Sequence, residues 1–226
     1  MGDYTYESPI LTEAELELLA PRAHRVAYPA GTDIVRRGDD SDFVLYLQSG
    51  HVKVLAGEPR SIVRIYKPGV VIGEFAILTG RLRTADLVAL NQVEALQIPG
   101  EAWVEFVLDS KRAAFVMLRF LSEMVIERDH RQAESMTSSE HKIARGIQTL
   151  IETGIGRQTD DGLRIAGFTQ SDLGSLSGLS RESAAVVLRR LREDKVLSTG
   201  RGYMVIHDLE ALNRMVKQVK KPPLTD

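Results

Sequence analysis

The residues with the clearest capacity for chemistry lie in the stretch VVIGEFAILTGRLRTADLVAL, residues 70–90. Gly73 and Glu74 precede a short apolar run, and Arg83 and Thr84 follow it. Backbone N–H groups near the glycine can point at a phosphate, a guanidinium can bind two of its oxygens, and a hydroxyl can donate one more hydrogen bond. A phosphate would repel the carboxylate of Glu74, for which a sugar hydroxyl is the obvious partner. The pattern therefore predicts a site for an anion.

These residues resemble the phosphate-binding cassette of the cyclic-nucleotide-binding domain, in which Gly-Glu, a short helix and Arg-Ser/Thr-Ala follow one another. The cassette pattern falls here on Gly73, Glu74, Arg83, Thr84 and Ala85. The resemblance implies that Glu74 binds the ribose 2′-hydroxyl and that Arg83 and Thr84 bind the cyclic phosphate. The alternative is a β-hairpin with a surface arginine and a paired glutamate, which is a common source of such matches.

The elements before and after the cassette indicate a strand-rich domain. Thr12 and Glu15 form the pattern of a capping box and predict a short helix that ends near Pro21. Short alternating segments broken by glycines then predict a small barrel or roll, and they resemble the β-roll of cyclic-nucleotide-binding domains. The predicted strands cover residues 24–28, 33–37, 43–48, 51–56, 61–66, 85–90 and 92–98.

A long helix is predicted after the roll, from Asp109 or Ser110 to about Ser135, and a shorter one precedes it at residues 101–107. Apolar residues recur along the long helix at spacings of three and four, as in a self-associating helix. In the family this helix forms a parallel dimer, so a homodimer is expected; the alternative is a helix that lies on its own domain's core. The recurring residues are Phe115, Leu118, Leu121, Met124 and Val125.

The same helix departs from the family at the depth where a purine base would lie. Nucleotide-activated members place a small hydroxyl residue there, whereas this chain has Glu127 and Arg128. The neighbouring candidates, none of them a clear match, are Ser122, Asp129, His130 and Gln132. The cassette residues for phosphate and ribose are present, whereas the residues for the base are not matched. Cyclic AMP is the expected effector, cyclic GMP is the second candidate, and ligand-free function is left open.

A second group of residues, in the stretch 169–194, predicts a helix-turn-helix. Thr169 and Asp172 cap the first helix, Gly178 forms the turn, and Ser180 caps a basic second helix that ends near Asp194. The helix-turn-helix is preceded by an amphipathic helix at 142–152, a polar loop at 157–162 and a strand at 163–168. It is followed by strands at 195–199 and 202–206, which form a wing.

The start of the second helix carries residues suited to base edges in a major groove. Arg181 can bind guanine, and Glu182 can accept a hydrogen bond from the cytosine amino group. Later basic residues of the helix and Arg201 at the wing tip can contact phosphates. The alternative for Arg181 and Glu182 is a solvated charge pair. The candidate DNA-binding residues are Thr169, Gln170, Ser180, Arg181, Glu182, Ser183, Val186, Arg189 and Arg201, with Arg190, Arg192 and Lys195 further along the helix.

This part resembles the winged helix-turn-helix of the CRP/FNR transcription regulators, where Ser-Arg-Glu-Thr opens the recognition helix. Ser180, Arg181, Glu182 and Ser183 match that pattern. Many members carry a second base-reading arginine at the position of Val186. A valine cannot donate a hydrogen bond, so one guanine contact would be lost or replaced by contact with a thymine methyl group.

Composition and charge agree with this interpretation. The 226 residues suffice for two small domains or one large one, and no cysteine is present, which excludes disulfides, thiolate catalysis, cysteine-held zinc and iron–sulfur clusters. Residues 1–138 hold 15 Lys and Arg against 20 Asp and Glu, whereas residues 139–221 hold 14 against 10. The basic second part therefore favours a nucleic-acid partner. No secretory signal or membrane span is apparent, so a soluble, cytoplasmic protein is expected.

The predicted fold class is α+β, with a β-roll sensor domain at residues 1–108, a dimerisation helix and hinge at 109–137, and a winged helix-turn-helix domain at 138–226. The function implied is a homodimeric transcription regulator that binds a palindromic double-stranded operator, with RNA polymerase as a candidate partner. A cyclic nucleotide would favour one placement of the recognition helices, matching half-sites about 34 Å apart. The rivals are a ligand-independent regulator, a regulator with another effector and a nucleotide sensor that acts through protein contacts. No catalytic or metal site is expected.

Overall fold

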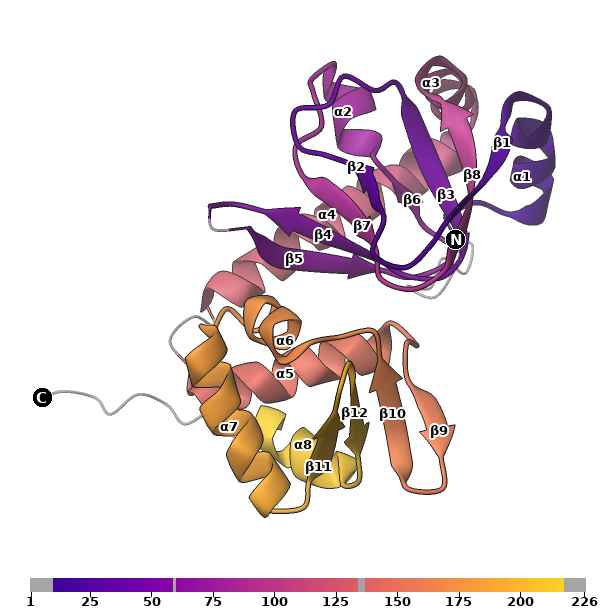
Figure 1. Ribbon diagram of the computed structural model, residues 1–226. Coiled ribbons are helices and arrows are strands. Elements are labelled where there is room, and N and C mark those ends of the chain that lie inside the picture. Colours follow the sequence, from indigo (N-terminus) through magenta and orange to yellow (C-terminus); the bar gives the residue numbers. More distant parts are fainter. Residues whose placement is uncertain (1–9, 59, 134–136, 218–226) are drawn as a thin grey trace, which may run out of the picture. The chain divides into compact units, whose positions relative to one another are not determined.

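The computed structural model describes residues 10–58, 60–133 and 137–217, with the side chains of residues 130–133 left out (Figure 1). It divides into two compact units, one made of residues 1–56 with 66–128 and the other of residues 57–65 with 129–226. The helix end predicted at Ser135 and the side chains of His130 and Gln132 lie outside the described part. The predicted boundaries of the three domains stay predictions.

Most of the first unit belongs to a roll of two four-stranded antiparallel sheets with its helices (Figure 1). The sheets have the strand orders β1-β8-β3-β6 and β2-β7-β4-β5. The strands are β1 (His24–Tyr28), β2 (Asp33–Val35), β3 (Phe43–Ser49), β4 (Val52–Ala56), β5 (Ser61–Tyr66), β6 (Val71–Ile72), β7 (Asp86–Ala89) and β8 (Val93–Pro99). The division by compactness places residues 61–65 of β5, the last strand of the second sheet, in the other unit.

The continuous apolar run of β3 explains the position of the first sheet. Successive side chains of a strand point to opposite faces, and here both faces are covered. Val44 and Tyr46 belong to one hydrophobic cluster, together with the helical residue Trp103, while Leu45 and Leu47 belong to a second cluster between the two sheets. The sheet that carries β3 is therefore the central layer of the roll.

The seven predicted strands of the roll are confirmed, each within a few residues. β6 was not predicted, because two residues are too short to show an alternation; it pairs with β3 through Leu45 and Tyr46. Thr12 and Glu15 form the predicted capping box at the start of α1 (Glu13–Leu19). The turn η1 (Ala20–Arg22) follows, with Pro21 near its start, as the sequence indicated.

The helices of the roll are α2 (Glu74–Thr79), α3 (Gly100–Asp109) and α4 (Lys111–Ala133). Trp103 of α3 is fully buried. The apolar residues of α4 divide between two faces: Ala113 and Met117 are buried in the roll, whereas Phe115 and Leu118 are exposed. The helix therefore covers its own core and still presents an apolar face.

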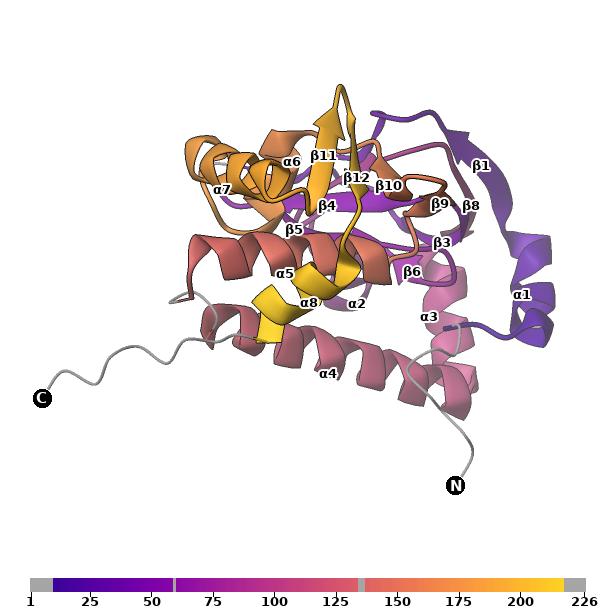
Figure 2. The same ribbon diagram turned by 90° about the horizontal axis from the view of Figure 1, so that it is seen from below.

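Within residues 137–217, the second unit has a four-stranded sheet of order β11-β12-β10-β9 and four helices. Buried residues of α5 recur at helical spacing and form its inner face, and α8 packs beside it (Figure 2). The elements are α5 (Ser139–Glu152), β9 (Arg157–Thr159), β10 (Gly162–Ala166), α6 (Gln170–Leu176), α7 (Arg181–Glu193), β11 (Leu197–Gly200), β12 (Tyr203–Ile206) and α8 (Leu209–Lys217).

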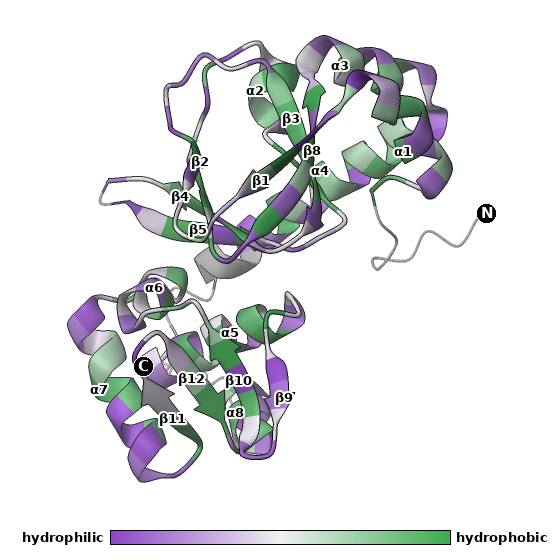
Figure 3. Ribbon diagram, turned by 45° about the vertical axis from the view of Figure 1, so that its right-hand side comes forward, coloured by the Kyte–Doolittle hydropathy of each residue, from purple (hydrophilic) through white to green (hydrophobic). Residues whose placement is uncertain are grey.

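The prediction of a polar loop at residues 157–162 is wrong. Arg157–Thr159 form strand β9, which pairs with β10 so that Arg157 lies opposite Arg164. Figure 3 shows why the sequence did not reveal it, since β10 is hydrophobic and β9 is hydrophilic. An edge strand needs hydrogen bonds to its neighbour and no buried side chains, so it carries no apolar alternation.

Candidate nucleotide site and DNA-binding surface

Arg83 lies in the interior of the cassette and is held by three hydrogen bonds. It is only 4% exposed. Its Nε donates to Ser41 Oγ at 2.7 Å, Nη1 to the Gly73 carbonyl at 2.8 Å and Nη2 to the Phe43 carbonyl at 2.6 Å. The guanidinium also lies over the Phe43 ring, 4.8 Å from its centroid. Arg83 is therefore not the surface arginine of the alternative hairpin interpretation.

Gly73 is required by the geometry around this arginine. Its φ of 87° is in the left-handed region, which favours glycine. A Cβ at this position would lie 2.6 Å from Arg83 Nη1, closer than two such atoms can approach. Any side chain at residue 73 would thus displace the guanidinium, which explains in physical terms why the pattern has a glycine there.

Glu74 and Thr84 differ in their exposure to solvent. Glu74, the first residue of α2, is 1% exposed, whereas Thr84 is exposed and Ala85 is half-buried. Thr84 is thus accessible to a ligand, whereas Glu74 is buried and its negative charge acts on Arg83. The structure brings together all five cassette residues that the sequence singled out.

The electrostatics of the site are set by one buried cation among carboxylates. Burial lowers the pKa of Arg83, and the negative charges of Asp42, Glu74 and Asp39 act in the opposite direction. A guanidinium remains protonated throughout the neutral range. The Arg83 guanidinium is therefore a permanent cation, with three carboxylates near enough to act on its charge.

The far half of α4 carries the residues predicted at purine depth. Glu127 is half-buried and Arg128 is exposed. Among the alternatives, the hydroxyl of the exposed Ser122 donates to the Leu118 carbonyl at 2.8 Å, and Asp129 is exposed. Ser122 and Val125 share the exposed face that begins at Phe115 and Leu118.

The helix-turn-helix forms as predicted from its caps and its turn. Thr169 and Asp172 form a reciprocal capping box on α6, and Ser180 Oγ accepts from the Ser183 N–H at 3.2 Å to cap α7. Gly178, with φ of 64°, forms the turn between the two helices. Gly174 lets them approach closely, because a Cβ there would lie 3.1 Å from Ala184 Cβ. These contacts fix the direction in which α7 projects.

One side of α7, including the first three residues of its N-terminal turn, is exposed to solvent. Arg181, Glu182, Ser183, Val186 and Arg189 are all exposed, while Ala184, Val187, Leu188 and Leu191 are buried against the rest of the unit. Hydrogen bonds from its own backbone N–H and from Ser180 lower the pKa of Glu182, with a smaller contribution from Arg181. Glu182 is therefore ionised at neutral pH, as an acceptor for a cytosine amino group must be.

Two of the basic residues on α7 are engaged elsewhere. Arg190 Nη1 lies 2.7 Å from Glu140 Oε1 on α5, and Arg192 donates to Thr199 Oγ1 at 3.0 Å. For Arg189, the described residues provide no ion pair. It is thus the best placed of the later arginines for a phosphate.

A hollow of about 250 Å³ lies between α6, α7 and the wing. Its lining includes Thr169, Gln170, Arg181 and Tyr203, so the starts of both helices and the wing contribute to one surface. Arg201 is exposed at the tip between β11 and β12, where the sequence placed it.

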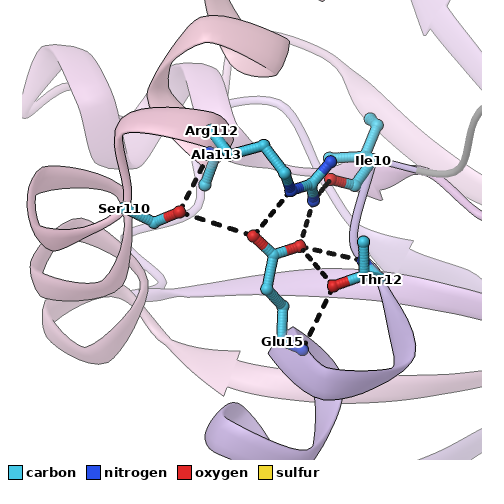
Figure 4. A network of polar contacts seen from close by, with 6 residues as sticks. All are labelled: Ile10, Thr12, Glu15, Ser110, Arg112 and Ala113. Atoms are coloured by element: carbon cyan, nitrogen blue, oxygen red, sulfur yellow. Dashed lines mark hydrogen bonds and ion pairs between the residues drawn. The ribbon is translucent and has the colours of Figure 1, made fainter. Parts of the chain in front are cut away.

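An interaction that sequence reasoning missed fastens α1 to the start of α4 (Figure 4). Arg112 donates to both carboxylate oxygens of Glu15, with Nε 2.8 Å from Oε1, and to the Ile10 carbonyl at 3.0 Å. Burial raises the pKa of Glu15, but hydrogen bonds from Arg112 and Thr12 outweigh it, so that the pKa lies below its ordinary value. The capping pattern had identified Glu15, but nothing local indicated a partner 97 residues away.

Comparison with known proteins adds to these observations. The cyclic nucleotide-binding domain model matches residues 25–110 and the Crp-like helix-turn-helix domain model matches residues 141–215. The chain is 25% identical over 213 residues to the cyclic AMP receptor protein of Thermus thermophilus, covering 91% of this chain and 94% of that protein.

Solved structures show the same fold. A structure of the regulator CLP from Xanthomonas campestris, described as c-di-GMP responsive, matches with a TM-score of 0.75 and 22% identity, over 87% of this chain and 99% of that one. A transcriptional regulator of the CRP/FNR family from Thermus thermophilus matches with a TM-score of 0.75 and 20% identity, over 87% of this chain and 100% of that one.

A cyclic-nucleotide-binding roll joined by a long helix to a winged helix-turn-helix defines a class of transcription regulators that bind DNA and a nucleotide with separate parts of one chain. This chain belongs to that class, and within it to the CRP/FNR family. Across the described ranges, no helix has the length and hydrophobicity of a membrane span, and no three His, Asp or Glu residues cluster as metal ligands.

Proposed function

We propose that this regulator is a homodimer whose affinity for its operator is controlled by cyclic AMP bound in the roll. The observation that carries the proposal is the burial of Arg83 and Glu74, whose charges interact, with the exposed Thr84 following Arg83 in the chain. A guanidinium and a hydroxyl are the groups that bind the oxygens of a phosphate. Glu74 would bind the ribose 2′-hydroxyl, with Arg83 and Thr84 on the phosphate and Gly73 and Ala85 completing the cassette.

The exposed apolar face of α4 supports the homodimer. Phe115, Leu118 and Val125 are 56%, 64% and 60% exposed and recur at the three- and seven-residue spacings of a coiled-coil seam. A row of exposed apolar side chains on a long helix is unfavourable in water. A second copy of α4 would cover the row with an identical one.

The exposed turn at the start of α7 supports sequence-specific DNA binding. Arg181 and Glu182 would read base edges, Ser180 and Ser183 would lie at the groove, and Val186 would contact a thymine methyl group. Thr169, Gln170, Arg189 and Arg201 would contact the phosphate backbone. In a dimer, two such surfaces would match the two halves of a palindromic operator.

Control by the nucleotide would operate as a shift between two populations. The ligand changes DNA affinity only if it binds more tightly to the form in which both recognition helices fit their half-sites. Residues of α4 at purine depth, Glu127 and Arg128, would decide how strongly the base contributes to that difference.

A second candidate is a regulator of the same architecture with a different effector. It is favoured by Glu127 and Arg128, which offer an acceptor and a positive charge where small hydroxyl residues are expected. The structural relative described as c-di-GMP responsive shows that this fold is also found with a different nucleotide. Cyclic GMP belongs to the same set of alternatives, as does a regulator that needs no ligand.

The decisive experiment measures operator binding with and without nucleotide. Operator DNA would be obtained by in vitro selection with the purified full-length protein, and its dissociation constant measured by fluorescence anisotropy at fixed salt with cyclic AMP, cyclic GMP or c-di-GMP. Cyclic AMP is expected to tighten binding. An operator affinity unchanged by cyclic AMP refutes the proposed effector, and tightening by c-di-GMP alone supports the second candidate. Equal affinity for every DNA sequence refutes specific recognition.

A further inference from the structure

The three hydrogen bonds of Arg83 differ in kind. Two go to backbone carbonyls, those of Gly73 and Phe43, and the third joins Nε to the side chain of Ser41 at 2.7 Å. A guanidinium has five N–H groups, so one N–H remains on each of the two Nη nitrogens. Of these three hydrogen bonds, the one to the Ser41 hydroxyl is therefore the one that a side-chain substitution of the acceptor can remove.

The loop that carries Ser41 is held by its own backbone. The Gly38 N–H donates to the Arg83 carbonyl at 2.8 Å, and the Arg83 N–H donates to the Asp39 carbonyl at 3.0 Å. The Arg37 N–H also donates to Asp86 Oδ1 at 2.7 Å. Since none of these bonds uses the Ser41 side chain, the loop should keep its path when the hydroxyl is removed.

We propose that Ser41 is a positioning residue for phosphate recognition, an inference that rests on the proposed nucleotide function. By accepting from Nε, Ser41 fixes the plane of the Arg83 guanidinium and leaves one N–H on each Nη nitrogen for the ligand. Two donors on adjacent nitrogens match the two exocyclic oxygens of a cyclic phosphate. Without the hydroxyl, the guanidinium can turn about its last bonds, and its Nε–H is buried without a partner.

The test measures cyclic AMP binding to full-length variants by isothermal titration calorimetry. Ser41→Ala is expected to weaken binding about tenfold, the scale of one hydrogen bond to a charged group. Ser41→Thr keeps the hydroxyl and should bind within about twofold of the wild type. The matched control is Ser49→Ala, because the Ser49 hydroxyl contacts Glu94 rather than Arg83; its affinity should not change.

A double-mutant cycle separates positioning from a general effect on the roll. If Ser41 acts through Arg83, then Ser41→Ala should cost nothing further in the Arg83→Ala background. An equal loss in both backgrounds, or wild-type or tighter affinity in Ser41→Ala alone, overturns the inference while leaving the proposed function intact. A wild-type protein that binds neither cyclic AMP nor cyclic GMP overturns both.

Discussion

The exposed face of α4 allows a quantitative prediction about self-association. Leu118 is 64% exposed, and full burial of a leucine side chain contributes about 1.5 to 3 kcal/mol. Covering the exposed part would then contribute about 1.5 kcal/mol per protomer, most of which Leu118→Ala removes. A two-fold interface contains the residue twice, so the substitution should cost the dimer about 3 kcal/mol, or roughly a hundredfold in dissociation constant.

Sedimentation equilibrium at several protein concentrations measures this constant directly. The control is Leu18→Ala, since Leu18 is 71% exposed on α1 and lies outside the α4 face. Leu18→Ala removes the same atoms from an exposed leucine side chain, but outside the α4 face. The dissociation constant of the dimer should therefore stay unchanged. A wild-type protein that is monomeric at tens of micromolar, or a Leu118→Ala variant as dimeric as the wild type, refutes the assignment of this face to a dimer.

Three further predictions concern the buried arginine, the recognition helix and the α1 anchor. Arg83→Ala should weaken nucleotide binding by about 1.5 to 3 kcal/mol in calorimetry, whereas the exposed neighbour Arg81→Ala should not; equal effects would show that only net charge matters. Arg181→Ala should cost about 1 to 3 kcal/mol at the selected operator and relax preference at one base pair, while a uniform loss on all DNA in the same anisotropy assay would assign it to phosphate. Glu15→Gln should lower the free energy of unfolding in urea by about 2 kcal/mol at pH 7, less than for a fully buried pair because the Arg112 side chain is 25% exposed. Because the pKa of Glu15 is lower in the folded protein, this contribution is present above the unfolded value of about 4.3 and is lost as pH falls through the folded value; a difference from wild type that persists at pH 2 would contradict the ion pair as its source.

Local patterns gave most of the elements correctly where the physical signal is local. The capping boxes at Thr12 and Thr169, the αL turn at Gly178 and the strands of the roll follow from hydrogen bonds and sterics within a few residues. The errors fall where the signal is weak or distant. β9 has no apolar alternation, and β6 is too short to show one.

The cassette shows the same division between local and distant information. The sequence placed Gly73, Glu74, Arg83 and Thr84 in one site and predicted that the Arg83 guanidinium binds two phosphate oxygens, but it gave no partners for the other N–H groups. In the folded chain, three of its N–H groups are taken by Ser41, Phe43 and Gly73. Two of these residues lie some forty positions away and match no pattern, so only the packing of the roll could identify them.

By itself, the sequence determined the class of element at each point and the chemical types gathered in the two sites, because capping, alternation and turn formation depend on neighbouring residues. Tertiary structure decided which of these groups are exposed and can contact a ligand, DNA or a second copy of the chain. It buried Glu74 and Arg83, left Thr84 and the start of α7 exposed, and divided the apolar residues of α4 between a core and an open face. Burial and hydrogen-bond pairing depend on segments far apart in the chain, and a single sequence carries no local record of them.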